Sequence, residues 1–122
     1  MAVDRLPVYN KVRQLYDQFT ASTRKSPISV KRGAMARVED SIIRMMVQLS
    51  FADEAESRPG ERLVIIREVI AGMREVMAYV RALYDLRLVK KSGFSALVTL
   101  EDNIMRQLTG WLNKTTLEIE NR

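Results

Sequence analysis

The sequence predicts an all-α protein: an antiparallel, up-down-up-down four-helix bundle in which residues 1–122 form a single domain. Four segments repeat apolar residues at the three- and four-residue spacing of a helix that buries one face. The three prolines fall at the boundaries of these segments, and the connections are shorter than about ten residues, which favours antiparallel neighbours. No segment shows the alternation of a β-strand.

The first two helices are predicted over residues 7–22 and 27–51. Pro7 suits a first helical turn, where a missing N–H costs nothing. Ser26 is interpreted as the N-cap of the second helix and Pro27 as its first residue. The apolar positions are Val8, Val12, Leu15, Tyr16 and Phe19 in the first helix and Val30, Ala34, Val38, Ile42, Met45, Met46 and Leu49 in the second.

The third and fourth helices are predicted over residues 61–87 and 93–118. A turn at Arg58-Pro59-Gly60 precedes the third helix, and Lys90-Lys91-Ser92-Gly93 closes it. Their inward positions are Leu63, Ile66, Ile70, Met73, Met77, Val80 and Tyr84, then Phe94, Leu97, Leu100, Ile104, Leu108, Trp111 and Leu112. At these spacings the helical methionines and Trp111 are interpreted as core residues, with a methionine-rich groove and a base-stacking platform as the alternatives.

The apolar face of the third helix is wider than one core requires. Ile65, Val69 and Val76 extend it, and the opposite side carries small residues, namely Ala71, Gly72, Ala78 and Ala82. Such a helix is expected to be buried on more than one face. Self-association and a central position within the bundle are both open explanations.

The composition disfavours several classes of function. Without cysteine or histidine, the chain has no thiol nucleophile, no disulfide and no histidine-containing di-metal carboxylate site. It has no glycine-rich phosphate loop, and no base accompanies its serines and threonines in a recognisable arrangement. We therefore expect a protein that is not an enzyme and uses no metal and no cofactor.

The chain is also expected to be cytoplasmic and to have no membrane partner. No run approaches the roughly 18 apolar residues of a membrane span, and the start Met-Ala-Val-Asp-Arg-Leu-Pro lacks the apolar core of a signal peptide. A basic protein lying on a membrane surface is a further alternative, but the expected Trp/Phe insertion face is missing.

The positive charge is unevenly distributed along the chain. The formal net charge is +5, and residues 1–52 hold nine Lys/Arg against four acids, whereas the remainder holds eleven of each. The whole surplus therefore belongs to the first half, which predicts a basic side on the molecule.

A row of arginines on the third helix lacks opposite charges. Arg67, Arg74 and Arg81 lie seven residues apart and share one face. Only Arg81 has an acid at helical spacing, Asp85 at i+4. An unpaired row suggests a partner on another chain, and phosphate is the leading candidate.

A second basic group surrounds the start of the second helix. It comprises Arg24, Lys25, Lys31 and Arg32, followed by Arg37 and Arg44. Asp40 lies within pairing distance of Arg37 and Arg44 along a helix, so this extension is expected to be partly neutralised. Cations near a helix N-terminus oppose the helix dipole unless an anion lies there. The alternative for both groups is that the cations are simply solvated.

The chain resembles the accessory variability determinant proteins of diversity-generating retroelements, small four-helix bundles related to proteins encoded in ribosomal RNA intervening sequences. The matching segments are Leu6-Pro7-Val8-Tyr9, Pro27 with Lys31-Arg32-Gly33, the arginine-bearing third helix that ends near Leu86-Arg87-Leu88, and Leu108-Thr109-Gly110-Trp111-Leu112. The last of these is the most specific.

The resemblance implies a function that composition alone does not give. Members of the family are not enzymes; they form homopentamers with a basic surface and bind the reverse transcriptase that copies template RNA into mutagenised cDNA. By position, Arg81 and Arg74 match the third-helix arginines thought to make those contacts. The hypothesis is a non-catalytic accessory factor that binds reverse transcriptase and RNA or DNA. The candidate contact residues are Arg24, Lys25, Lys31, Arg32, Arg37, Arg67, Arg74 and Arg81. The alternative is a four-helix-bundle protein-interaction module that binds no nucleic acid.

Overall fold

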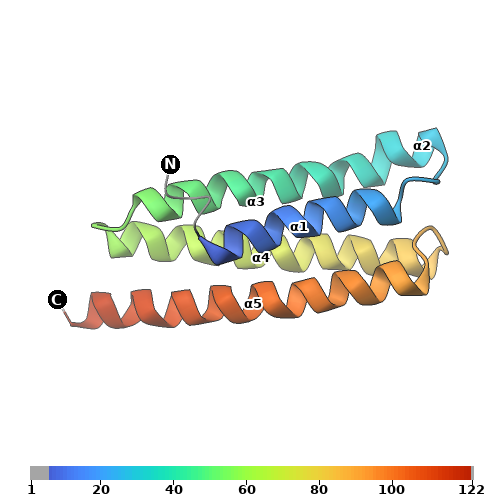
Figure 1. Ribbon diagram of the computed structural model, residues 1–122. Coiled ribbons are helices and arrows are strands. Elements are labelled where there is room, and N and C mark those ends of the chain that lie inside the picture. The colour runs from blue at the N-terminus through green and yellow to red at the C-terminus, as the bar shows by residue number, and fades with distance from the viewer. Residues whose placement is uncertain (1–5, 122) are drawn as a thin grey trace.

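The computed structural model describes residues 6–121 and shows four long helices packed side by side (Figure 1). They are α1 (Pro7–Ser22), α3 (Ala36–Glu54), α4 (Pro59–Asp85) and α5 (Lys91–Glu120). Both α1 and α4 pack against α3 and α5, so the helices form a closed ring of four neighbours. No β-strand occurs in the described residues. The prediction of an all-α four-helix bundle is confirmed.

Two of the three connections lie at the same end of the bundle. The chain between α1 and α3 and the chain between α4 and α5 meet at the right-hand end in Figure 1, and residues from both line a common hollow. The connection between α3 and α4 lies at the opposite end, together with the C-terminal end of α5.

The core consists of the apolar positions that recur at helical spacing. The residues with no exposed surface include Val12, Leu15, Phe19, Val38, Ile42, Leu49, Ile66, Val69, Met73, Val80, Leu97, Ile104 and Leu108. Met35 and Met73 are fully buried and Met45 is nearly so, which confirms core packing for these methionines. Trp111 packs against the core from its edge.

The second predicted helix is broken rather than continuous over residues 27–51. A short α2 (Ile28–Val30) leads into a π-helical segment, η2 (Lys31–Met35), before α3 begins. The break lies at Gly33, whose φ of −93° and ψ of −107° leave the helical region. Pro27, not Ser26, holds the N-cap position, and no side chain caps this end. The predicted N-cap is therefore wrong, and the helix runs on to Glu54.

The start of α4 also differs from the prediction. Pro59 and Gly60 are its first helical residues, so the turn predicted at Arg58-Pro59-Gly60 does not form there. Proline suits this position because the first helical residues have no intrahelical partner for their N–H groups.

The turn between α4 and α5 is a Schellman motif. The Leu88 N–H donates to the Leu83 carbonyl and the Arg87 N–H donates to the Tyr84 carbonyl, both at 2.9 Å. Arg87 occupies the left-handed position of this motif, with a φ of 63°. Lys91, Ser92 and Gly93 form the first turn of α5. The prediction that they close the preceding helix is therefore wrong.

The wide apolar face of α4 is explained by its position within the bundle. Val69 and Val76 are buried in the core and Ile65 packs against it. Among the described residues of α4, Val64 alone is a large apolar residue that stays exposed, at 54%. The apolar face is therefore covered largely within the chain, whereas Ala71, Ala78 and Ala82 on the opposite side of α4 stay exposed.

Within residues 6–121, none of the helices combines the length and the apolar character that crossing a membrane requires.

Candidate functional site

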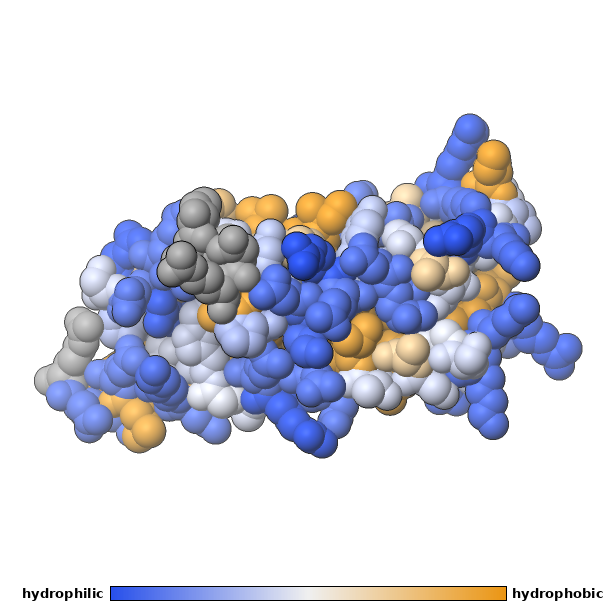
Figure 2. Space-filling model, viewed as in Figure 1, coloured by the Kyte–Doolittle hydropathy of each residue, from blue (hydrophilic) through white to orange (hydrophobic). Residues whose placement is uncertain are grey.

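Positive charge gathers at the end of the bundle where the two connections meet. The chain segments 23–35 and 85–93 carry seven cations and one acid, Asp85. We call these cations the basic end: Arg24, Lys25, Lys31, Arg32, Arg87, Lys90 and Lys91. All except the half-buried Lys31 are exposed. Hydrophilic side chains project from this end in the space-filling view (Figure 2).

The opposite end of the bundle is acidic. Among residues 6–121 it carries Asp53, Glu54, Glu56, Glu61, Glu118 and Glu120 against Arg58, Arg62 and Lys114. Arg58 is paired with Glu61 at 3.3 Å, and Arg62 is buried. The bundle is therefore polarised along its axis, whereas the sequence analysis predicted a basic side made by the first half of the chain. The difference arises because the second half contributes three of the seven cations.

A hollow of about 770 Å³ opens at the basic end. Arg24 and Lys25 line it from the α1–α2 connection, and Arg87 and Lys90 line it from the α4–α5 connection. The other lining residues are Gln18, Ala21, Ser22, Ser26, Pro27, Leu88, Ser92, Gly93 and Ala96. The Gln18 amide Nε2 donates to Ser22 Oγ at 2.9 Å, which fixes part of this polar wall.

The first basic group predicted from the sequence is only partly brought together. Arg24 and Lys25 line the hollow, whereas Lys31 and Arg32 lie in η2 at the same end, outside its lining. Arg37 lies exposed in α3. Asp40 forms no direct ion pair with Arg37 or with Arg44, so the expected pairing is not seen.

The arginine row on α4 is present but separate from the hollow. Arg67, Arg74 and Arg81 are all exposed. Arg81 Nε pairs with Asp85 Oδ1 at 3.1 Å, and its guanidinium carbon lies 5.9 Å from the centre of the Phe94 ring. Within the described residues, Arg67 and Arg74 make no ion pair. The row thus keeps two free cations on the flank of the bundle.

Arg87, Lys90 and Lys91 were not predicted as site residues from the sequence. These residues were interpreted only as the end of a helix. In a bundle whose successive helices are antiparallel, the first and third connections meet at one end. Adding the charges of those two connections would therefore have indicated a basic end from the sequence.

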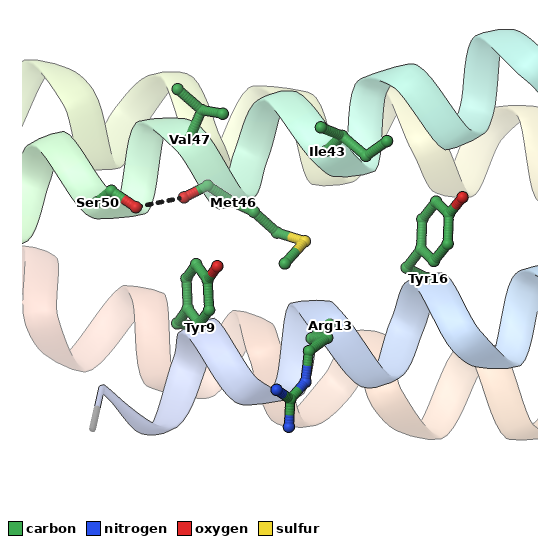
Figure 3. A pocket seen from close by; sticks show the side chains of 7 residues that line it. All are labelled: Tyr9, Arg13, Tyr16, Ile43, Met46, Val47 and Ser50. Carbon is green, nitrogen blue, oxygen red and sulfur yellow. Dashed lines mark hydrogen bonds between the residues drawn. The ribbon is translucent and has the colours of Figure 1, made fainter. Parts of the chain in front are cut away.

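A second, apolar feature lies on the side of the bundle. A groove of about 340 Å³ separates α1 from α3 (Figure 3). Its lining is Tyr9, Arg13, Tyr16, Ile43, Met46, Val47 and Ser50. Ile43, Val47 and Phe51 follow one another along α3 at intervals of four residues and are 45%, 47% and 55% exposed. Apolar atoms accordingly gather over α3 along the upper edge of Figure 2.

Tyr16 and Glu39 connect the two walls near one end of this groove. The Tyr16 hydroxyl donates to Glu39 Oε2 at 3.3 Å. Burial raises the pKa of Tyr16, and the neighbouring negative charge of Glu39 raises it further. The phenol is therefore a hydrogen-bond donor at neutral pH. Among the residues that line the groove, Arg13 is the charged one.

Among residues 6–121, no three acidic side chains lie close enough together to hold a metal ion. No protein-family model matches this chain, and no similar protein is found among curated proteins.

Proposed function

We propose that this protein is a non-catalytic accessory factor that binds nucleic acid through its basic end. The observation that carries the proposal is the gathering of seven cations from two distant chain segments at one end of the bundle. The opposite end is acidic, so the two ends differ in their interaction with a polyanion. Arg67 and Arg74 add free cations on the flank.

The chemistry of these contacts is electrostatic. Lysine and arginine bind backbone phosphates and release the counterions that surround nucleic acid, so affinity falls as salt rises. The exposed side chains at the basic end are suited to phosphate contacts, which position a nucleic acid without selecting its sequence. Binding is therefore expected to be weakly sequence-specific.

The resemblance to accessory variability determinant proteins supplies the biological context of this proposal. In that context the chain is a cytoplasmic up-down-up-down bundle that assembles as a homopentamer. It binds the reverse transcriptase of a diversity-generating retroelement and its template RNA or cDNA, and so supports mutagenic cDNA synthesis. The meeting of the first and third connections at one end is the arrangement that this topology produces.

The proposal predicts salt-dependent binding of structured RNA. We expect measurable affinity at about 50 mM salt and a loss of about 10³-fold or more by 200 mM if six or more phosphates are contacted. Fluorescence anisotropy of a labelled RNA hairpin at both salt concentrations measures this. Absence of binding at low salt, or an affinity indifferent to salt, would contradict the proposal.

The groove between α1 and α3 favours a second candidate, a protein-interaction module that binds no nucleic acid. Three large apolar side chains stay partly exposed along α3, and burying each against a partner is worth roughly 1–2 kcal/mol. In this candidate the apolar face does the binding and the basic end is simply solvated.

A homo-oligomer assembled through this apolar face would be disrupted by a charge placed on it. We expect Val47→Glu to dissociate the homo-oligomer while helicity is retained, because a charge on this face opposes its burial. Val98→Glu on α5 is the matched control, since Val98 is 39% exposed and lies outside the groove. Light scattering measures both variants. A monomeric wild-type protein, or equal behaviour of the two variants, would count against an oligomer built on this face.

A further inference from the structure

We propose that the hollow at the basic end is a phosphate-binding site for single-stranded nucleic acid. A backbone phosphate lies between Arg24 and Lys25 on one wall and Arg87 and Lys90 on the other. This inference rests on the proposed function and deepens it, because it assigns the contact to one cavity rather than to the whole basic surface.

The first support is the convergence of four cations on one concave surface. The two walls come from connections far apart in the sequence, so the fold alone brings these charges together. Mutual repulsion of like charges around a cavity is unfavourable unless an anion is bound between them. A phosphate within the hollow neutralises charge from both walls at once.

The second support is the absence of ion pairs at the lining cations within the described residues. None of the four lining cations forms an ion pair within residues 6–121. Asp85 lines a neighbouring hollow together with Arg87 and Lys90, but its carboxylate is paired with Arg81 at 3.1 Å. The hollow therefore presents its four positive charges to a ligand rather than to the protein.

The third support is the backbone conformation of Arg87. Its position in the Schellman motif is one where glycine is usual, because a side chain in the left-handed region costs about 1 kcal/mol or more. The two hydrogen bonds of the motif are made by the backbone, so glycine would form them equally well. What arginine adds is a cation lining the hollow, and an unfavourable conformation retained at such a position is typical of a functional residue.

The shape and setting of the hollow favour a chain of phosphates over a small phosphorylated molecule. Its lining cations are exposed, and small-ligand sites bury most of their ligand. Further cations, namely Lys31, Arg32 and Lys91, continue beyond the hollow at the same end. A polyanion contacts both sets together, and a single strand is flexible enough to enter a concave surface between two connections.

The decisive experiment compares a variant that removes two positive charges from the hollow with a control that removes two from the acidic end. The hollow variant is Arg24→Gln with Arg87→Gly, and the control is Arg58→Gln with Lys114→Gln. The probe is a fluorescein-labelled oligouridylate, and the readout is the slope of log K against log salt. Loss of two phosphate contacts on a single strand lowers the slope by about 1.4, since each contributes about 0.7. The control is expected to leave the slope unchanged.

Arg87→Gly alone separates binding from folding. We expect its melting temperature to equal or exceed that of the wild type, because glycine is favoured at a left-handed position. Its affinity for oligouridylate should nevertheless fall several-fold at low salt. A variant that is both more stable and weaker in binding excludes a merely structural role for Arg87.

The outcomes that overturn the inference differ from those that overturn the proposed function. If the wild type does not bind RNA at low salt, the proposed function fails and this inference fails with it. If the wild type binds but the hollow variant matches the control, only the hollow is wrongly assigned. If inorganic pyrophosphate at constant ionic strength binds the wild type but not the hollow variant, while oligouridylate binds both equally, the hollow takes a small phosphate and the single-strand assignment is wrong.

Discussion

Replacing Arg62 with methionine is expected to lower the free energy of unfolding by about 2–4 kcal/mol. Arg62 is 8% exposed, and its guanidinium donates to two carbonyl groups in the last turns of α3. Nε reaches the Ala52 oxygen at 2.8 Å and an Nη atom reaches the Asp53 oxygen at 3.1 Å. The final carbonyls of a helix lack intrahelical partners, so without Arg62 these groups remain near the core with one hydrogen bond fewer.

The same side chain also joins α4 to α5. Its guanidinium carbon lies 5.0 Å from the centre of the Trp111 ring, a favourable cation–π distance. Arg62 thus holds the end of α3, the start of α4 and the C-terminal half of α5 together. A residue with these contacts stabilises the acidic end of the bundle, away from the hollow.

Urea denaturation followed by circular dichroism measures the effect. Arg58→Met is the matched control, because Arg58 is exposed and its ion pair with Glu61 is worth at most about 1 kcal/mol. Arg62→Lys keeps the charge but loses the forked geometry of the guanidinium. Its free energy of unfolding is expected to lie between those of Arg62→Met and Arg58→Met. Equal transition midpoints for Arg62→Met and Arg58→Met would show that the guanidinium contacts contribute nothing measurable.

The sequence predicted the bundle because burial and helical periodicity coincide over most of the chain. Positions such as Leu15, Ile42, Met73 and Ile104 are both periodic and fully buried. The prediction was least accurate at the helix ends, which depend on local backbone geometry rather than on periodicity. Gly33 leaves the helical region where the pattern continues, and Pro59 begins a helix where its composition indicated a turn.

The candidate site was predicted only where its charges are adjacent in the sequence. Arg24 and Lys25 were identified from their local clustering. Arg87 and Lys90 were not, because their proximity to Arg24 depends on how the connections meet in space. Arg62 was missed for a related reason, since its role requires the end of α3, which a pattern within α4 does not contain.

Gly93→Ala is the second substitution with a large expected effect, a loss of about 1–3 kcal/mol of stability. A Cβ atom at this position would lie 2.7 Å from Ser22 Oγ and 3.0 Å from Ser22 Cβ. The hydroxyl can rotate away, but Cβ is fixed to the backbone of α1. The first turn of α5 would therefore move away from the end of α1, which would also change the wall of the hollow.

Gly110→Ala is the matched control because it lies in the same helix and a Cβ there meets nothing within 4 Å. Alanine is the better helix former, so this variant should gain up to about 1 kcal/mol. Gly→Ala is thus expected to lower stability at Gly93 and raise it at Gly110, and this difference in sign distinguishes close packing from helix propensity.

A double-mutant cycle with Ser22→Gly tests whether the contact itself is responsible. Ser22→Gly removes both atoms that the new Cβ would meet, at the cost of the hydrogen bond from Gln18. In that background Gly93→Ala should cost little or become stabilising, which gives a coupling energy of about 1 kcal/mol or more. Additive effects would mean that α1 and α5 separate freely at this end. In that case the wall of the hollow would not be held in place by this contact, and the spacing of its cations would depend on the two connections alone.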